Sequence, residues 1–283
     1  MNAPAEVSAA EGVERRLEIA PAFEALLRRN GLSDPEALLN LRGAASLGKR
    51  GLASWRERLR VELQGEGGRR ASFFLKRYVD PPRSAVRAAR RTCAAARTLA
   101  GVEWTWMRRL AESGIGVPTA VALAEERRGE RELRSAVLIT EVPGESLEAW
   151  FARKAGSADE IRRRLIAPLA SLIRRFHETG HVHRDLYAAH AFVEETVAGP
   201  VFRLIDLQRV FRPRWRRRRW IVKDLASLSY SCPAGLVSRV ARVRWLKHYL
   251  EVSRLRAGDK RLIRSIAHKT RSIARHDARR LRR

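Results

Sequence analysis

The chain has 283 residues, 45% of them hydrophobic, which is enough for one large domain or for two lobes with a buried core. This composition excludes a disordered tail. The formal net charge of +27, from 58 lysines and arginines against 31 acidic residues, predicts a polyanionic partner such as nucleic acid, anionic lipid or a phosphorylated substrate. Arginine is much commoner than lysine and alanine is abundant, so codon bias is an alternative source of part of the charge.

The first 38 residues predict an N-terminal extension to which we assign no chemistry. They contain acidic residues where a signal peptide would need a basic start and an apolar run. A short amphipathic helix is expected, with Phe23 and Leu27 on its apolar face and the sequence NGLSDP at its end. No later stretch approaches 18 uncharged apolar residues, so we expect a cytoplasmic protein or one attached to a membrane from that side.

Two runs of strand-forming residues come next. RLRVEL (58–63) and ASFFLKRYV (71–79) flank the turn QGEGGRR and predict a hairpin, with Lys76 as a charged residue in the middle of the second strand. The preceding GAASLGKR (43–50) only approximates the phosphate-binding pattern G-x-x-x-x-G-K-[ST], because Arg50 stands where a hydroxyl must reach magnesium. We therefore expect a loose loop there and not a P-loop.

A helical segment and a strand follow this hairpin. The alanine-rich segment from Pro81 to Gly114 predicts one long helix or two, because its apolar residues recur at helical spacing. SAVLITEVPGESL (135–147) predicts a buried strand that ends in a Pro-Gly crossover. Such a crossover suits a hinge between two lobes.

A helix and a hairpin surround the sequence HVHRDLYAAH (181–190). The apolar face of the helix is formed by Ile161, Leu165, Leu169, Leu172 and Phe176. The helix stops at Gly180, which places residues 181–190 on a loop. AFVEE and VFRLIDL, joined by TVAGP, predict a tight hairpin that brings His190 at its start near Asp206 at its end.

Three charged residues in these segments form the set that phosphoryl transfer requires. A lysine holds the phosphates of a nucleotide, one acid carries magnesium, and a second acid positions the attacking hydroxyl. In this chain the set would be Lys76, Asp206 and Asp185.

The motifs also resemble a known family. HRDLYAAH (183–190) is similar to the kinase catalytic loop H-R-D-L-x-x-x-N, with histidine in place of asparagine. Together with FFLKRY, RLIDLQRV and VKDLASLSYS, it resembles the lipopolysaccharide core heptose and Kdo kinases of bacteria, which share the protein-kinase-like fold. The resemblance covers roughly residues 40–250 and rests on the order of the motifs, because no single motif is specific.

The resemblance implies an α+β, two-lobed protein-kinase-like fold. We expect an N-terminal extension (1–38), then a small β-rich N-terminal lobe that binds nucleotide with its sheet and helix (39–143). A larger helical C-terminal lobe (144–283) would contain the catalytic loop, the metal-binding hairpin and basic C-terminal helices.

The resemblance also implies a role for each site residue, with ATP and Mg²⁺ as cofactors. Asp185 would be the catalytic base, Lys76 would contact the nucleotide phosphates, and Glu103 would be the helix carboxylate that pairs with Lys76. Asp206 would hold the metal, with His190 as a second candidate ligand. Imidazole is a softer ligand than magnesium prefers, so the number of metal ions is left open.

The implied acceptor is a sugar hydroxyl, of heptose or Kdo, on the lipid A-core glycolipid of lipopolysaccharide. We therefore expect peripheral attachment to the anionic inner face of the cytoplasmic membrane. We do not expect nucleic acid as the partner, although stacking of RNA on RPRWRRRRW (212–220) is the rival to anion recognition by that segment. Whether a partner protein stabilises the chain is left open.

Two other interpretations of the function are left open. The chain could be another small-molecule or protein kinase of this fold, or a basic binding protein that reuses the fold without catalysis. Residues 253–283 predict a helix with an apolar stripe flanked by arginines, which could pack on the lobe or contact a membrane.

Overall fold

The structure is a computed structural model that describes residues 6–8, 12–42, 45–46, 53–153 and 164–281. Ile161 and most of the segment 43–50 lie outside the described residues. The chain divides into two compact units: unit 1 contains residues 1–111 and 118–141, and unit 2 contains residues 112–117 and 142–283.

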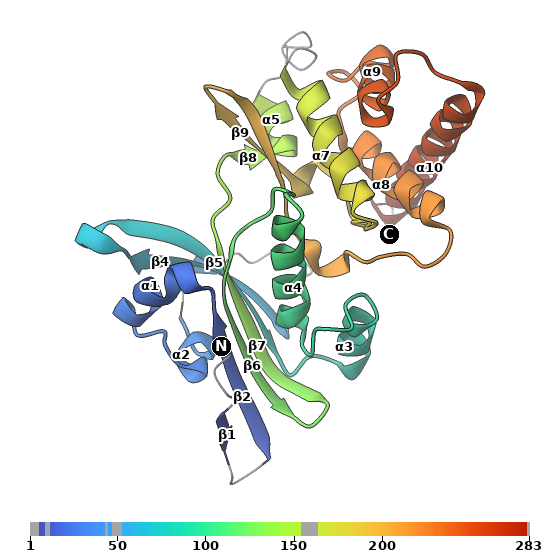
Figure 1. Cartoon of the computed structure of the whole chain (residues 1–283). Coiled ribbons are helices and arrows are strands. Elements are labelled where there is room, and N and C mark those ends of the chain that lie inside the picture. Colours follow the sequence, from blue (N-terminus) through green and yellow to red (C-terminus); the bar gives the residue numbers. More distant parts are fainter. Residues whose placement is uncertain (1–5, 9–11, 43–44, 47–52, 154–163, 282–283) are drawn as a thin grey trace. The chain divides into compact units, whose positions relative to one another are not determined.

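Unit 1 is built on a seven-stranded antiparallel sheet in the order β1-β2-β6-β7-β5-β4-β3 (Figure 1). Its strands are β1 (Glu6–Ser8), β2 (Val13–Ile19), β3 (Ala45–Ser46), β4 (Arg56–Gln64), β5 (Arg70–Val79), β6 (Ala120–Arg128) and β7 (Arg131–Thr140). Its helices are α1 (Glu24–Arg29), α2 (Pro35–Leu39), α3 (Arg83–Arg90) and α4 (Leu99–Glu112), the last of which ends at the first residue of unit 2. The predicted hairpin is therefore confirmed as β4 and β5.

Side chains along β4 and β5 alternate between an apolar face of the sheet, which is buried in the core, and the opposite face. Leu59 and Val61 on β4, and Phe73 and Leu75 on β5, are buried in one core on the same face. Lys76 follows Leu75 and therefore projects from the opposite face. The alternation of side chains along β5 thus places Lys76 on the face of the sheet opposite the apolar core.

The core face of the sheet is covered by the segment predicted to be an extension. Leu27 of α1 and Leu38 and Leu39 of α2 join the apolar core, and β2 pairs in register with β6. Residues 13–39 thus form part of unit 1 and are not a separate segment. Strand β2 was not predicted, because its sequence VERRLEI is mostly polar. Its contacts with β6 include ion pairs such as Arg15 with Glu126.

Two helices, not one, follow β5. Thr98 ends the turn between α3 and α4, and its hydroxyl accepts the N–H of Gly101 at 3.0 Å. A threonine hydroxyl that caps the first turn in this way is a common helix start. Helix α4 begins there, with residues 99–104 all buried.

Unit 2 is mainly helical, with a small three-stranded sheet. Its elements are β8 (Glu145–Ser146), α5 (Leu147–Arg153), α7 (Ile166–Glu178), β9 (Ala191–Thr196), β10 (Gly199–Leu204), α8 (Arg217–Ser231), α9 (Arg239–Leu250) and α10 (Ala257–Leu281). The sheet order is β10-β9-β8, and β9 with β10 is the predicted hairpin. The chain re-enters this unit at Val142, and Gly144 then passes so close to β9 that a Cβ on it would lie 2.1 Å from the carbonyl oxygen of Val193.

The C-terminal helix α10 packs along α8 within unit 2 (Figure 1). The hydroxyl of Thr270 donates to the carbonyl of Ala226 on α8 at 3.4 Å, and Ile263 and Ile266 line a cavity together with α8. Part of the apolar stripe therefore packs on the lobe, which was one of the two roles predicted for it. Among the described helices, none combines the length and apolar character needed to cross a bilayer.

Candidate active site

In unit 1 the predicted lysine and glutamate meet. The ammonium of Lys76 on β5 forms an ion pair with the carboxylate of Glu103 on α4. The Lys76 side chain is 13% exposed and that of Glu103 is 2% exposed, so the pair is largely removed from water. Removing one partner would take the ion pair away from the buried charge of the other, which is unfavourable. Each group therefore holds the other in place.

In unit 2 the loop 181–190 is fastened at its base. Val182 forms an antiparallel bridge with Phe211. The buried carboxylate of Asp224 on α8 accepts the N–H of His183 at 2.6 Å and the N–H of Arg184 at 2.8 Å. Arg184 has a left-handed backbone, with φ 71°, which is unfavourable for a side chain of its size. Two hydrogen bonds to one carboxylate offset that strain immediately before Asp185.

Two buried histidines, one in this loop and one on α7, contact groups that hold the loop in place. The ring of His183 is buried, and its Nε2 lies 3.0 Å from the carbonyl oxygen of Ile205. Burial lowers the pKa of His183, because it disfavours the charged ring. His177 is also buried, between the hydroxyl of Tyr249 at 2.8 Å and Asp224 at 3.4 Å. Both rings thus support the loop.

Two cations that sequence reasoning did not single out flank Asp185. Arg209 donates to both carboxylate oxygens of Asp185, at 3.0 and 2.7 Å, and the ammonium of Lys223 lies 3.6 Å away. Burial lowers the pKa of Lys223, partly offset by Asp185. Their closeness to the motif aspartates could have marked them in the sequence. Lys223 precedes Asp224 in the KDLA sequence, and Arg209 lies three residues after Asp206.

The hairpin brings His190 and Asp206 together as predicted. Nε2 of His190 lies 3.7 Å from the carboxylate of Asp206. Nδ1 of the same ring lies 2.8 Å from the backbone carbonyl oxygen of Asp185. A carbonyl can only accept, so Nδ1 carries a proton. Nε2, which has a lone pair whenever the ring is neutral, is the nitrogen on the side of Asp206.

These donors fit a magnesium ion that is completed by its substrate. Magnesium commonly binds one or two carboxylates plus phosphate oxygens and water, and does not need an all-protein cage. Asp206 supplies a partly exposed carboxylate, and its left-handed backbone, with φ 60°, turns the chain directly after β10. Among the described residues no group of three or more histidine, cysteine or acidic side chains could hold a metal, so phosphates and water would have to provide the remaining ligands.

Part of the arginine-rich segment 212–220 has structural contacts. The guanidinium of Arg217 donates to the carbonyl of His177, and that of Arg184 lies over the ring of Trp220, 5.6 Å from its centre. Trp215, in contrast, is 83% exposed. The segment therefore contains both packed residues and a large aromatic side chain in solvent.

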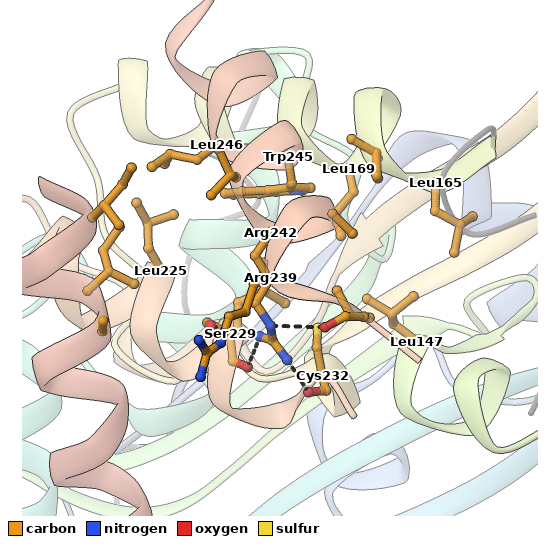
Figure 2. A pocket seen from close by; sticks show the side chains of 18 of the residues that line it. Leu147, Leu165, Leu169, Leu225, Ser229, Cys232, Arg239, Arg242, Trp245 and Leu246 are labelled. Atoms are coloured by element: carbon orange, nitrogen blue, oxygen red, sulfur yellow. Dashed lines mark hydrogen bonds between the residues drawn. The ribbon is translucent and has the colours of Figure 1, made fainter. Parts of the chain in front are cut away.

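Unit 2 also contains an apolar cavity of about 520 Å³ (Figure 2). Figure 2 shows Leu169, Leu225 and Leu246 around it, from α7, α8 and α9. Arg242 lies in its wall but donates to Ser229 and to the carbonyl of Cys232, at 2.8 Å each. Arg242 thus connects α9 to the end of α8. The cavity, with its mostly apolar lining, suits an apolar ligand.

Residues 82–249 match the family model described as the lipopolysaccharide kinase (Kdo/WaaP) family, which is more than half of the chain. The chain belongs to this family. Kinase families transfer a phosphoryl group from a nucleotide, so membership supports ATP as the proposed phosphoryl donor. Lys76 and Glu103 form a pair in unit 1, and Asp185, His190 and Asp206 form a group in unit 2. The roles assigned to these five residues stay predictions.

Individual relatives point to the same family. The chain is 31% identical over 154 residues to the lipopolysaccharide core heptose(I) kinase WaaP of Pseudomonas aeruginosa, covering 52% of this chain and 58% of that one. It is 36% identical over 138 residues to WaaP of Escherichia coli K12, covering 46% and 51%. It is 34% identical over 117 residues to 3-deoxy-D-manno-octulosonic acid kinase of Xylella fastidiosa, covering 41% and 43%. The matched stretch thus spans about half the length of these relatives.

A solved structure shares the fold over nearly the whole chain. WaaP in complex with acyl carrier protein matches with a TM-score of 0.66 and 25% identity, over 91% of this chain and 98% of that one. The predicted kinase-like fold, with a β-rich unit and a helical unit, is confirmed.

Replacing Asp224 by Asn should destabilise unit 2. One oxygen that accepts a loop N–H would become a donor facing it, leaving a buried donor unsatisfied. We expect a loss of about 2 kcal/mol in the free energy of unfolding, measured by urea denaturation. The matched control is Asp259→Asn, because that carboxylate accepts the N–H of Arg256 at an exposed site and its loss should cost little. Equal losses in both variants would contradict the structural role of Asp224.

Proposed function

We propose that the protein is an ATP-dependent kinase that phosphorylates a sugar hydroxyl of the lipopolysaccharide inner core. The single observation that carries this proposal is the Asp185 group within unit 2. A carboxylate beside two cations, one loop away from a second carboxylate, is the arrangement that phosphoryl transfer to a hydroxyl needs. The names of the relatives support a sugar of the lipopolysaccharide core as acceptor.

Asp185 would act as the base toward the acceptor hydroxyl. Its carboxylate is held by Arg209 and Lys223, and its backbone carbonyl is held by His190, so its oxygens have little freedom to turn away. The acceptor oxygen would attack the γ-phosphorus of ATP, and the bond from that phosphorus to the ADP oxygen would break as the new P–O bond forms. The carboxylate of Asp185 would accept the proton that the acceptor hydroxyl loses. The two cations beside it are suited to stabilise negative charge on the transferred phosphoryl group.

Asp206 would hold magnesium, which neutralises charge on the nucleotide phosphates when it is bound. The lone pair of His190 on the same side makes it the second candidate ligand. In unit 1, Lys76 would contact the nucleotide phosphates while Glu103 keeps its ammonium in position. Unit 1 would therefore be the nucleotide-binding lobe and unit 2 the catalytic lobe. The acceptor sugar would be a heptose or Kdo, since relatives of both kinds match.

Two aspartate variants should separate catalysis from nucleotide binding. Asp185→Asn should bind Mg-ATP nearly as the parent does but lose turnover by about 10²-fold or more, because a positioned base typically contributes 10²–10⁴. Asp206→Ala should lose the magnesium dependence of ATP binding. Calorimetry with ATP, with and without Mg²⁺, and transfer of labelled phosphate to lipopolysaccharide cores that differ in their inner sugars measure both effects.

Each aspartate variant serves as the control for the other. Parent-like turnover of Asp185→Asn would remove this residue from the mechanism. Unchanged Mg-ATP binding by Asp206→Ala would remove the metal-binding role. A parent protein that transfers phosphate to no core would contradict the proposed acceptor.

We also propose that unit 2 attaches to anionic membranes through exposed arginines. The apolar stripe of α10 is partly used in packing, so attraction would come from exposed residues such as Arg264, Arg275 and Arg279, with Trp215 as an interfacial side chain. Each basic residue near an anionic surface contributes up to about 1 kcal/mol. Trp is favoured at membrane interfaces.

Changing Arg264, Arg275 and Arg279 to Gln should weaken binding to anionic vesicles by up to about 100-fold at low salt, since three charges are lost. Co-sedimentation with phosphatidylserine-containing and with zwitterionic vesicles measures the effect. The matched control changes Arg28, Arg29 and Arg69 of unit 1 to Gln. These arginines are also exposed, and their replacement lowers the net charge by the same amount. Equal weakening by both triple variants would show that total charge, and not unit 2, governs attachment.

Acyl carrier protein is a candidate partner of this chain as well. The support is the fold match to WaaP in complex with acyl carrier protein, together with an apolar cavity in unit 2 of a size that an acyl chain could fill. Burial of an alkyl chain in such a space is favourable by about 0.8 kcal/mol per CH₂.

Acylated carrier protein should therefore raise the melting temperature of this protein by several degrees, and the unacylated form by less, because only the first fills the cavity. Ala267→Phe, which places a ring at the cavity wall, should abolish the difference while leaving Mg-ATP binding intact. Differential scanning calorimetry checks the shift. Equal stabilisation by both forms of the carrier would show that the cavity is not its acyl site.

A further inference from the structure

The N-terminal turn of α4 rests on two buried carboxylates of the sheet in unit 1. Glu125 on β6 is 4% exposed and Glu132 on β7 is 2% exposed. They lie on the neighbouring strands β6 and β7, outside the sequence motifs HRDLYAAH, FFLKRY, RLIDLQRV and VKDLASLSYS. Buried acidic side chains are rare unless they are paired, which calls for a physical reason.

Glu132 holds the first backbone groups of the helix. Its Oε2 accepts the N–H of Leu99 at 2.9 Å, and its Oε1 accepts the hydroxyl of Ser135 at 2.6 Å. The oxygen of Ser135 in turn accepts the N–H of Ala100 at 3.3 Å. The first N–H groups of a helix have no partner within the helix, so the sheet supplies two of the missing acceptors.

Glu125 holds the same turn through Thr98. The Thr98 hydroxyl donates to Glu125 and accepts the N–H of Gly101 at 3.0 Å. A Cβ on Gly101 would lie 2.9 Å from the Glu125 carboxylate and 3.0 Å from the Thr98 oxygen. The carboxylate therefore lies close against the helix, and a side chain at position 101 would force it to shift. Glu125 and Ser135 are also direct partners across β6 and β7, which brings both halves of the contact together.

The electrostatics are consistent with such a support. The positive end of the α4 dipole favours negative charge at this point. The pKa of Glu132 is nevertheless raised to about 7, chiefly by burial and to a smaller extent by the neighbouring Glu125. The hydrogen bonds from Ser135 and Leu99 and the charge of the buried Arg127 oppose this rise. Arg16 of β2 lies 3.7 Å from Glu125 and offsets part of its charge.

We propose that Glu125 and Glu132 are positioning residues that hold α4 so that Glu103 meets Lys76. Glu103 lies four residues after Leu99, about one turn along the helix, so a shift or rotation of the first turn moves its carboxylate directly. The ion pair that orients Lys76 is thus maintained by contacts within unit 1, without a phosphorylated loop. The inference rests on the proposed nucleotide-binding function of Lys76.

The first test compares two glutamates of the same hairpin. Glu132→Ala removes both acceptors, whereas Glu130→Ala removes a side chain that is 79% exposed and pairs with Arg90 on the surface. In ligand-free protein, hydrogen exchange at the amides of residues 99–103 should rise at least 10-fold in Glu132→Ala and stay parent-like in Glu130→Ala. The affinity for Mg-ATP, measured with a fluorescent ATP analogue, should fall about 10-fold in the first variant only.

A double-mutant cycle distinguishes positioning from general destabilisation. In a Glu103→Gln background the ion pair is already weakened, so adding Glu132→Ala should change Mg-ATP affinity by less than about twofold. Glu132→Gln keeps one oxygen for the N–H of Leu99 and should recover much of the affinity. The same fold-loss in both backgrounds would overturn the proposal, because Glu132 would then act without Glu103.

A second pair of variants covers the case in which Glu132→Ala fails to fold. Thr98→Val keeps the shape of the side chain but removes the hydroxyl that joins Glu125 to the helix, whereas Thr98→Ser keeps it. Faster exchange at residues 99–103 and weaker Mg-ATP binding in the first variant alone are expected. Identical behaviour of the two variants would overturn the proposal.

The two readouts separate this inference from the proposed function. If the parent protein bound no Mg-ATP, the proposed function would fail, and the exchange data would still decide whether the carboxylates hold the helix. If the parent bound Mg-ATP but exchange and affinity ignored Glu132 and Thr98, the proposed function would stand and the positioning role would be rejected.

Discussion

The carboxylate of Asp224 is the constraint on which the catalytic loop depends. It lies without solvent exposure on α8 and accepts two successive N–H groups of the loop, at His183 and Arg184. Those hydrogen bonds offset the left-handed conformation of Arg184, which in turn directs Asp185 toward Arg209 and Lys223. Because Lys223 adjoins Asp224 on the same helix, one element sets both the backbone of the loop and part of its charge.

A similar principle operates in unit 1. There, Glu125 and Glu132 receive the unpaired N–H and hydroxyl groups at the start of α4, and Glu103 follows one turn later. In both units a buried acid satisfies backbone donors that water cannot reach, which is the condition under which a buried carboxylate is tolerated. Acidic residues are outnumbered by basic ones in this chain, 31 to 58, and the two sites use several of them for geometry as well as for chemistry.

Arginine has an equally structural use. Arg77 donates to the carbonyls of Leu39 and Leu41, at 2.9 and 3.0 Å, and so ties α2 to β5. Arg242 binds the carbonyls of Cys232 and Val237, at 2.8 and 3.2 Å, between α8 and α9. A guanidinium has five donors in a rigid plane, against three on the ammonium of lysine, and can satisfy several carbonyls at once. Part of the large positive charge is therefore explained by internal hydrogen bonding, independently of any anionic partner.

The sequence alone determined the elements that carry a strong local pattern. The alternation in β4 and β5, the apolar periodicity of α7 and the hairpin of β9 and β10 were all readable, because each depends on residues close together in the chain. The order of the motifs likewise identified the family, and the hairpin length brought His190 to Asp206.

Only the tertiary structure decided which distant residues share a site. The strand Val13–Ile19 was missed because its polar sequence pairs with β6 partly through ion pairs, which leave no periodic signal. Arg209 and Lys223 could not be assigned to Asp185, since α8 and the loop approach each other only after folding. The support of α4 by Glu125 and Glu132 was equally hidden: buried acids look like surface acids in a sequence, and their burial is a property of the packed molecule.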